Sequence, residues 1–267
     1  MKIVGIISSP KQDGNTAVLV REALRGAREH GADSEEIFLP QYHLEFCQDC
    51  MTCMAQGECA LPDDLESLKQ KIAASDGIIL GSPTHGLAPN AIMKNFLDRI
   101  GMFAVYTGAW AGKYVVGIST AGGIGAKKVA RHLTMFTDSV FGRGYVSGTL
   151  GVLRGWKRIE QYPEHLERAC HLGQKLTEDI RQKRTYPFQN LFGRLFGRLV
   201  LRRIFLNNIV QHKDTGMKAV YATLVARKQI RKDIERSDHE NRACGVMDKT
   251  SGNSEKFLCG ILRRDAE

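Results

Sequence analysis

Five short apolar runs, separated by turn residues and by segments of helical periodicity, constrain the fold of this chain more than any other feature. After the first run, Val20, Ala23, Leu24 and Ala27 recur on one helical face. Strands that are apolar throughout are buried on both faces, and strands that alternate with helices pair in parallel. The pattern therefore predicts an α/β fold with a five-stranded parallel sheet. The predicted strands are residues 2–8, 35–39, 77–81, 114–119 and 144–150.

The segments between these strands are predicted to be helices that cover both faces of the sheet. In one of them, Asp63-Asp64-Leu65-Glu66 is typical of an N-cap with an acid three positions later, and this helix is expected to end near Ala74. Five strands within residues 1–185 suit a flavodoxin-like, doubly wound domain. Three further helices are marked by Ile92, Phe96 and Ile100, by Val129, Leu133, Phe136 and Val140, and by residues 161–184.

Ligands of doubly wound sheets bind outside the carboxyl ends of the strands. The loops after the first, third and fourth predicted strands all begin with small or polar residues, and a cysteine-rich stretch follows the second. Because the carboxyl ends of parallel strands share one edge, we expect these four loops to lie at the same edge.

The loop of residues 8–16 joins the first strand to the first helix. Its hydroxyls, backbone N–H groups and helix N-terminus can hold an anion such as a phosphate. It lacks the G-x4-G-K-[ST] pattern of a P-loop, and residues 123–128 do not fit G-x-G-x-x-G. An ordinary turn with an N-cap at Asn15 or Thr16 explains the loop equally well, so these residues alone leave both interpretations open.

Cys47, Cys50, Cys53 and Cys59 lie within thirteen residues, in the spacing C-x2-C-x2-C-x5-C. Four thiolates repel one another and converge only when a cation or a cluster neutralises them. The two x2 gaps match the first three ligands of a bacterial ferredoxin motif, whereas zinc sites usually join two cysteine pairs across a longer spacer. The spacing favours an iron–sulfur cluster, with zinc and redox-active thiols as alternatives. Cys170 lies on a helical pattern and is predicted to be a buried small hydrophobe.

Three of the loops resemble those of the NADPH-dependent FMN reductase family of flavodoxin-like proteins. Ser9-Pro10-Lys11-x-x-Gly14-Asn15-Thr16 is similar to its S-P-R-x-x-G-N-T loop, and residues 81–86 resemble its G-S-P-x-Y loop. Lys94-x-x-x-Asp98-Arg99 looks like the family's K-x-x-x-D-R, and Thr120-x-Gly122-Gly123 resembles the loop along the isoalloxazine ring. Two positions depart from the family: Lys11 stands in place of Arg and loses the bidentate fork, and His85 stands in place of Tyr. The resemblance implies that FMN is bound by Ser9, Lys11, Gly14, Asn15, Thr16, Pro83, Thr84, His85, Gly86, Thr120, Gly122 and Gly123.

Together with these loops, the cysteine spacing resembles the compact motif of the iron–sulfur flavoproteins, a branch of the same family. The likeness covers about residues 1–150. It implies that Cys47, Cys50, Cys53 and Cys59 hold a 4Fe–4S cluster, and that electrons pass between the cluster and FMN with ferredoxin or a similar carrier as donor. It also implies a homo-oligomer, a dimer or tetramer, in which the cluster of one subunit approaches the flavin of a neighbour. Two other functions stay open: an NAD(P)H-dependent FMN or quinone reductase without a cluster, and a non-catalytic redox-sensing or docking module.

The positive charge of the chain is concentrated near its C-terminus. The net charge is +9 over 267 residues, and residues 185–235, with ten basic and three acidic side chains, supply +7 of it. No aromatic interleaving accompanies these charges, so a nucleic-acid partner is not expected. Residues 186–235 are predicted to form a basic helical extension, and residues 236–267 a disordered tail. The extension carries an apolar stripe of Leu191, Phe192, Leu195, Phe196 and Leu199, with Arg194, Arg198 and Arg202 on another face.

Residues 191–206 fit two uses of an amphipathic helix. They can lie on an anionic membrane surface, or they can pack on their own domain or a partner subunit, which is the use we expect. No apolar stretch reaches the roughly 18 residues of a membrane-spanning helix, and the run at residues 3–7 is too short for a signal peptide. We therefore expect a cytoplasmic protein, whose thiols stay reduced.

Overall fold

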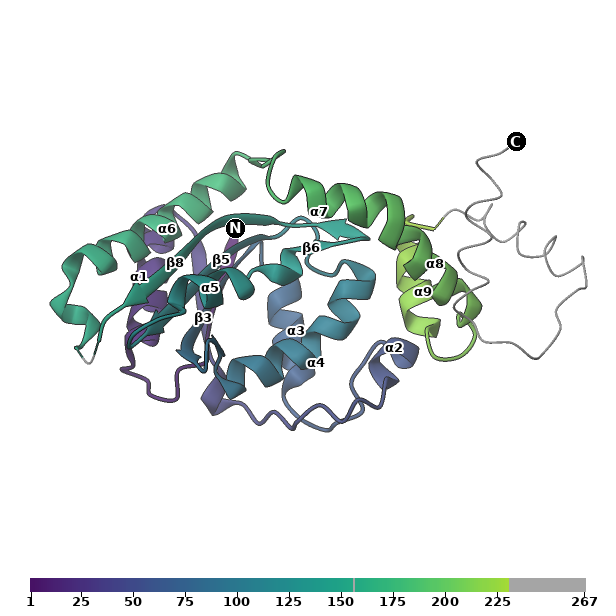
Figure 1. Cartoon of the computed structure of the whole chain (residues 1–267), viewed down its shortest axis with the longest axis horizontal. Coiled ribbons are helices and arrows are strands. Elements are labelled where there is room, and N and C mark those ends of the chain that lie inside the picture. Colours follow the sequence, from purple (N-terminus) through teal and green to yellow (C-terminus); the bar gives the residue numbers. More distant parts are fainter. Residues whose placement is uncertain (156, 231–267) are drawn as a thin grey trace, which may run out of the picture. The chain divides into compact units, whose positions relative to one another are not determined.

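The five predicted strands form one parallel sheet in the order β2–β1–β3–β5–β8 (Figure 1). This order is that of a flavodoxin-like, doubly wound fold, as predicted. A short strand, β4 (Ala88–Pro89), turns back antiparallel against the end of β3. The parallel strands are β1 (Lys2–Ile7), β2 (Asp33–Phe38), β3 (Gly77–His85), β5 (Tyr114–Ala121) and β8 (Tyr145–Leu153).

The structure is a computed structural model, and it describes residues 1–155 and 157–230. Residues 1–227 form a single compact unit that includes the helices of the predicted C-terminal extension. The tail predicted at residues 236–267, and the last five residues of the predicted extension, lie outside the described residues.

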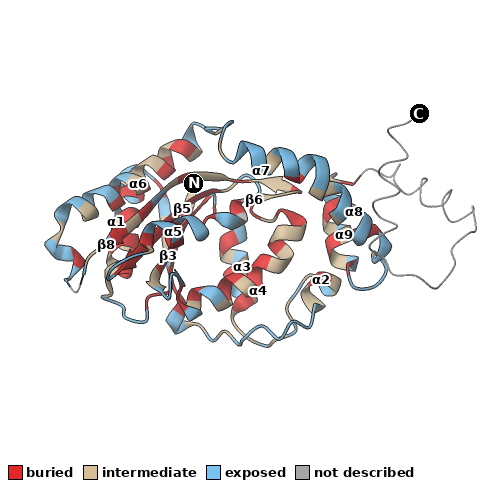
Figure 2. Ribbon diagram, viewed as in Figure 1, coloured by how far each residue is buried: buried red, intermediate tan, exposed pale blue. Residues whose placement is uncertain are grey.

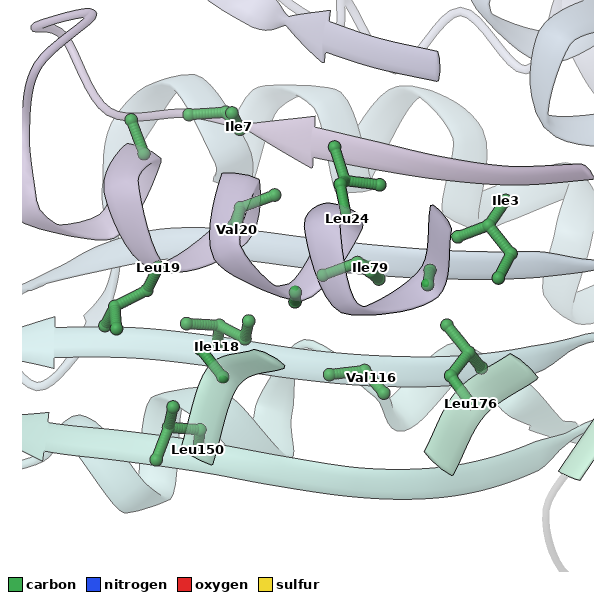
Figure 3. Packing of buried hydrophobic residues seen from close by; sticks show 14 of the residues in the cluster. Ile3, Ile7, Leu19, Val20, Leu24, Ile79, Val116, Ile118, Leu150 and Leu176 are labelled. Atoms are coloured by element: carbon green, nitrogen blue, oxygen red, sulfur yellow. The ribbon is translucent and has the colours of Figure 1, made fainter. Parts of the chain in front are cut away.

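One face of the sheet is covered by α1 (Asn15–Glu29) and α6 (Pro163–Arg181). Alternate residues of the strands, such as Ile3, Ile79 and Ile118, pack beneath these helices (Figure 3). The two helices approach each other so closely that a Cβ on Gly26 would lie 2.0 Å from a carbonyl oxygen of α6. A Cβ on Gly173 would lie 1.7 Å from a carbonyl oxygen of α1. Glycine at both positions therefore permits this crossing.

The opposite face is covered by α3 (Leu65–Ala73), α4 (Ala91–Thr107) and α5 (Ala126–His132), which lies against β5 and β8. Phe96 of α4 is fully buried there against strand residues such as Ile78 and Leu80. The alternation of strand side chains between the two clusters explains why the central strands are apolar throughout. Shorter helical segments connect these layers: η1 (Leu39–Gln41), α2 (Thr52–Gln56) and η3 (Ile159–Gln161).

The prediction of one helix from Val129 to Val140 is wrong for the second half of that range. The observed α5 (Ala126–His132) ends early and is followed by a 3₁₀ turn, η2 (Met135–Thr137), and a hairpin of β6 (Asp138–Ser139) and β7 (Gly142–Arg143). The Thr134 hydroxyl donates to the carbonyl of Arg131 at 2.8 Å, and its backbone N–H donates to the same carbonyl at 3.0 Å. Such local bonds compete with the helical ladder and end the helix.

The C-terminal extension is helical, as predicted, and runs through α7 (Leu191–Phe196), a π-helical turn η4 (Gly197–Leu201), α8 (Arg202–Gln211) and α9 (Lys218–Ala226) (Figure 1). The Gln189 amide exchanges two hydrogen bonds, of 3.0 and 2.9 Å, with the backbone of Val146 on β8. The ring of Phe205 packs against Tyr106 of α4, with 5.0 Å between ring centroids. The residues of the apolar stripe, which runs through α7 into η4, are largely open to solvent, with exposed fractions from 43% for Leu191 to 86% for Phe192 (Figure 2). No helix among the described residues is long and apolar enough to cross a membrane.

Candidate functional site

The loop after β1 leads into an uncapped helix N-terminus. No side chain accepts a hydrogen bond from the first turn of α1, whose N-cap is Gly14. A Cβ on Gly14 would lie 2.2 Å from the Ser9 Oγ, so the loop closes tightly only around glycine. Ser9 itself is buried and donates to the backbone carbonyl of Lys11 at 3.0 Å, while the Lys11 side chain is exposed. The open first turn and the nearby exposed ammonium together suit an anion.

Two predicted phosphate ligands, Asn15 and Thr16, also form hydrogen bonds with other segments of the protein. The Asn15 Oδ1 accepts from the backbone N–H of Ile159 at 2.9 Å, and its amide N–H donates to the carbonyl of Lys157 at 3.4 Å. The Thr16 hydroxyl lies 2.7 Å from the hydroxyl of Thr120. Asn15 thus ties the first loop to the segment after β8, and Thr16 ties it to the loop after β5.

Asn90, which the sequence did not single out, connects the first two loops. Its side-chain oxygen accepts from the Ser8 hydroxyl at 2.7 Å and from the Ser82 hydroxyl at 3.2 Å, and its amide donates to the Ser8 carbonyl at 2.6 Å. The same oxygen accepts from the N–H of Met93 and caps α4. All of these groups are buried or nearly so, so the network holds the ends of β1 and β3 in a fixed relation.

The second and third loops are joined in the same way. The Thr84 and Ser119 hydroxyls lie 2.9 Å apart, and Ser119 also donates to the Ser82 carbonyl at 2.7 Å. Gly86 and Leu87 both have positive φ, as a two-residue turn between paired strands requires. The structure therefore brings the three predicted flavin loops together. Of their residues, Thr120 is buried, Pro83 and Thr84 are half-buried, and His85, Gly86, Gly122 and Gly123 are exposed.

The four motif cysteines line a single pocket. The pocket is bounded by the loop of residues 47–53, by Cys59 and by one side of α4. Asp49 and Met51 adopt positive φ, so the chain bends sharply twice between the first three cysteines. Cys47 and Cys50 are exposed, whereas Cys53 and Cys59 are half-buried. The sequence prediction that these thiols gather at one place is consistent with this arrangement.

A buried ion pair forms the inner wall of the cysteine pocket. Arg99 of α4 donates to both carboxylate oxygens of Asp63, at 2.7 and 3.1 Å, and both side chains are at most 1% exposed. The same guanidinium donates to the Cys59 Sγ at 3.2 Å and to the Glu45 carbonyl at 2.6 Å. Burial opposes the charge of Arg99, but Asp63 and the Cys59 sulfur outweigh it and raise the pKa of the guanidinium. A fixed positive charge thus faces the sulfur atoms.

The thiols also influence one another. Burial raises the pKa of Cys53, and the neighbouring sulfur atoms of Cys59, Cys47 and Cys50 raise it further. Hydrogen bonds from the side chain and backbone of Thr52 lower the pKa of Cys50. Mutual repulsion of this kind is what a bound cation or cluster removes.

Helix α4 sets the distance between the flavin loops and the cysteine pocket. Asn90 at its N-cap joins the flavin loops, Asn95 accepts from the N–H of Cys47 at 3.3 Å, and Arg99 reaches Cys59. At 1.5 Å per residue, positions five and nine residues along the helix are about 7.5 and 13.5 Å from its start. The pocket therefore lies along the side of α4, displaced from the strand ends themselves.

The donor set suits a metal cluster, but the thiols are not arranged as ligands in this conformation. Within residues 1–155 and 157–230, no three Cys, His, Asp or Glu side chains are grouped closely enough to hold a metal ion. The four sulfur donors nevertheless line one pocket beside a buried guanidinium. The residues present also fit FMN, because the uncapped N-terminus of α1 lies where the three interlinked loops meet.

Three features of the site lie outside the sequence prediction. No periodicity or motif in the sequence marks Asn90 as a site residue. Its partners, Ser8 and Ser82, lie at the ends of two strands, 82 and 8 residues away in the chain. The contact of the segment after β8 with Asn15 could have been found, because this segment follows a fifth parallel strand at the same edge. The ion pair of Arg99 with Asp63 joins residues 36 positions apart and has no sequence signal beyond the family-like motif around Arg99.

Comparison with known proteins agrees with this geometry. Residues 1–156 match the family described as NADPH-dependent FMN reductase. An iron–sulfur flavoprotein of Archaeoglobus fulgidus is 33% identical over 186 residues, which cover 68% of this chain and 82% of the relative. One of Methanocaldococcus jannaschii is 41% identical over 99 residues, which cover 37% of this chain and 51% of that protein.

Solved structures share the fold. A flavone reductase superposes with a TM-score of 0.59 at 16% identity and covers 94% of this chain and 100% of its own. An NAD(P)H:quinone oxidoreductase from Methanothermobacter marburgensis gives a TM-score of 0.52 at 18% identity, over 66% of this chain and 96% of its own. The chain therefore belongs to the NADPH-dependent FMN reductase family of flavin-dependent oxidoreductases, in its iron–sulfur flavoprotein branch.

Proposed function

We propose that this chain passes electrons between a 4Fe–4S cluster held by Cys47, Cys50, Cys53 and Cys59 and an FMN held by the three interlinked loops. The observation that carries the proposal is the position of the four thiols. They line one pocket on the side of α4, the helix whose N-cap joins the flavin loops. The names of the relatives from Archaeoglobus fulgidus and Methanocaldococcus jannaschii support the same pairing of cofactors.

The flavin site would take FMN by its phosphate and its ring. The N–H groups at the start of α1, with Ser9, Lys11, Gly14, Asn15 and Thr16 around them, would bind the phosphate. The exposed backbone of Gly122 and Gly123 leaves space for a planar ring beside the hairpin that carries Pro83, Thr84, His85 and Gly86. Thr120 would hold the two parts together through Thr16. Bound FMN supplies the exchange between two-electron and one-electron chemistry, and the protein supplies orientation.

At the cysteine pocket, the chain would supply four thiolates and the charge that balances them. The Arg99 guanidinium lies against Cys59 and is fixed by Asp63, so one positive charge is already in place. A cluster at this position supplies one-electron transfer, with ferredoxin or a similar carrier as donor. Cys47 and Cys50 are exposed, which supports a homo-oligomer in which a neighbouring subunit covers the pocket.

A second candidate is an NAD(P)H-dependent FMN or quinone reductase whose cysteines bind zinc or no metal. It is supported by the match of residues 1–156 to the family described as NADPH-dependent FMN reductase. The two candidates differ in iron content, and that difference decides between them.

The first test is the absorption spectrum and the iron and acid-labile sulfide content of anaerobically purified protein. We expect about four iron and four sulfide per chain together with one FMN, as a 4Fe–4S cluster requires. Zinc in place of iron, or protein that contains FMN and no metal, would establish the second candidate.

The second test compares Cys53→Ser with Cys170→Ser, which removes the thiol of a cysteine on α6 outside the pocket. Cys53→Ser should lose or convert the cluster and keep FMN, because the flavin loops are untouched. Reduction of the flavin by reduced ferredoxin should then stop, while reduction by dithionite continues. Cys170→Ser should behave as the parent. Unchanged reduction by ferredoxin in Cys53→Ser would remove the cluster from the electron path.

A further inference from the structure

The segment of residues 188–204 presents an apolar face that the described part of the chain leaves uncovered (Figure 2). Its apolar side chains at positions 191, 192, 195, 196 and 199 recur every three or four residues along α7 and η4, so they form one stripe on the helix, and Phe188, in the turn just before α7, is counted with this stripe. The exposed fractions reach 83% for Phe188 and 86% for Phe192. Single exposed apolar residues are ordinary, but six in one stripe mark an interaction surface. The stripe consists of Phe188, Leu191, Phe192, Leu195, Phe196 and Leu199, and each is at least 43% exposed.

The helix that carries the stripe is anchored from its other sides. Before α7, Gln189 is hydrogen-bonded to the backbone of Val146, and in α8 Phe205 packs against Tyr106. The Arg202 guanidinium lies 5.4 Å from the centre of the Phe141 ring. The stripe is therefore presented by a helix that is already folded and fixed, so a partner does not have to order it on binding.

The charge of this segment points to the nature of its partner. Residues 185–213 contain four Arg and one Lys and neither Asp nor Glu. Arg194 and Arg198, four residues apart, lie on the same side of the helix and flank the stripe. Arg198 and Arg203 are exposed. A membrane with acidic lipids has an apolar interior beneath anionic headgroups. An apolar stripe bordered by basic residues is complementary to both layers.

A second copy of the chain fits this surface less well. Symmetric pairing of two identical stripes would bring the arginines of both helices together, with no acidic residue in either segment to balance them. Such like-charge contacts oppose association. The helices are also unsuited to spanning a membrane, because none of those described is long and apolar enough. A position in the plane of the membrane surface satisfies both the stripe and the charge.

We propose that residues 188–204 form an in-plane anchor that attaches this protein to membrane surfaces rich in anionic lipid. The phenylalanines and leucines of the stripe enter the boundary between headgroups and acyl chains, and Arg198 and Arg203 contact the headgroup phosphates. The sequence alone favours docking of residues 191–206 on protein; the exposure of the stripe and the lack of acidic residues around it are what favour the membrane surface. This inference is independent of which cofactors the flavin and cysteine sites hold.

The test is co-sedimentation of the full-length protein with vesicles of phosphatidylcholine alone or with about one third phosphatidylglycerol. We expect binding to the anionic vesicles that weakens as salt is raised, because Debye screening shortens from about 10 Å at 0.1 M to 3 Å at 1 M. A basic residue near an anionic surface contributes about 1 kcal/mol, a factor of about five in affinity. The double variant Arg198→Gln/Arg203→Gln should therefore bind about 25-fold more weakly.

Matched variants separate the two parts of the anchor. Phe188→Ser/Phe192→Ser should weaken binding more than a hundredfold, since burial of the two phenylalanines together contributes at least about 3 kcal/mol. Leu153→Ser, which alters an exposed apolar residue on β8, should bind as the parent does. Arg28→Gln/Arg168→Gln, which removes two exposed arginines from α1 and α6, is the control for net charge and should retain most of the binding.

Several results would overturn the proposal. One is the absence of sedimentation with anionic vesicles at low salt, and another is equal binding to vesicles of phosphatidylcholine alone. A third is a control pair, Arg28→Gln/Arg168→Gln, that weakens vesicle binding as much as Arg198→Gln/Arg203→Gln does. Binding would then depend only on the net charge of the protein. If the phenylalanine variant instead lowers the mass in analytical ultracentrifugation and the parent ignores vesicles, the stripe is a contact between copies of the chain.

Discussion

Replacing Arg99 with methionine should destabilise the protein far more than breaking a surface pair of the same geometry. Arg99 and Asp63 are both almost completely buried, so Arg99→Met leaves a carboxylate in the interior without its main partner. Methionine keeps much of the length of the side chain, so the change removes charge and hydrogen bonds with little loss of volume.

The size of the effect follows from what Asp63 retains. Removing one member of a buried ion pair costs about 3–5 kcal/mol, most of it from the charge left behind. Asp63 also accepts from the backbone N–H groups of Glu45 at 2.8 Å and Leu65 at 3.1 Å, and both bonds survive the substitution. These two bonds place the expected loss in the lower part of the range, at about 3–4 kcal/mol of unfolding free energy.

Urea unfolding followed by circular dichroism measures this loss, and Arg21→Met is the matched control. Arg21 donates to both carboxylate oxygens of Glu36, at 2.8 and 2.7 Å, but both side chains are about one third exposed. An exposed pair contributes about 1 kcal/mol or less. The two variants therefore differ in burial while they share the bidentate geometry.

The reasoning would be refuted if Arg99→Met and Arg21→Met cost the same, because burial would then not determine the effect. A third variant, Arg99→Lys, retains the charge and loses the planar fork. It should fall between the parent and Arg99→Met in stability, and should retain more iron than Arg99→Met if the charge beside Cys59 helps to hold a cluster.

Three further predictions concern other parts of the structure. Asn90→Ala should cost about 2–3 kcal/mol, because it removes a helix cap, the shared buried acceptor of the Ser8 and Ser82 hydroxyls and the side-chain donor to the Ser8 carbonyl, and it should release FMN on gel filtration. Burial raises the pKa of Asp179, but hydrogen bonds from Lys175 and Tyr186 outweigh it and lower the pKa. Its stabilisation is complete above about pH 4 and is lost as pH falls through the lowered folded pKa, so urea unfolding of Asp179→Asn should change less than the parent over this range. Gly26→Ala should cost about 1–3 kcal/mol because its Cβ would meet the α6 backbone, whereas Gly216→Ala, with open space at its Cβ, should unfold in urea as the parent does.

The parallel sheet was predictable because its signals are local. Each central strand is an apolar run bounded by turn residues, and the helices between strands show their buried face at regular spacing. The second half of the helix predicted at Val129–Val140 has the right apolar spacing, but the side chains of Thr134 and Thr137 bond to the carbonyls three residues before them. Competition between side chain and backbone is invisible to a periodicity count.

The candidate site was predictable in its loops and cysteines, and unpredictable in the groups that connect them. Motif residues such as Gly14 and Thr120 are short-range signals. The role of Asn90 depends on Ser8 and Ser82 reaching the same point from different strands, which only the folded sheet brings about. The apolar stripe of the extension was likewise predictable as one face of a helix. Whether that face packs on the domain or faces solvent depends on where Gln189 attaches the helix to β8.

The arrangement of helices on the two sides of the sheet has a consequence for how the protein forms during synthesis. The side lined by α3, α4 and α5 has all of its covering helices once His132 has been made. The side covered by α1 and α6 is complete only after Arg181 has been synthesised, because α6 ends there. Helix α6 is the partner that crosses α1 at Gly26 and Gly173. At about 5–20 residues per second, the intervening 49 residues (181 − 132) take about 2–10 s to translate. During that interval the nascent chain carries a half-covered sheet, with residues of β5 such as Val116 and Ile118 not yet covered by α6 and open to other proteins, a stage at which a ribosome-bound chaperone would find its target.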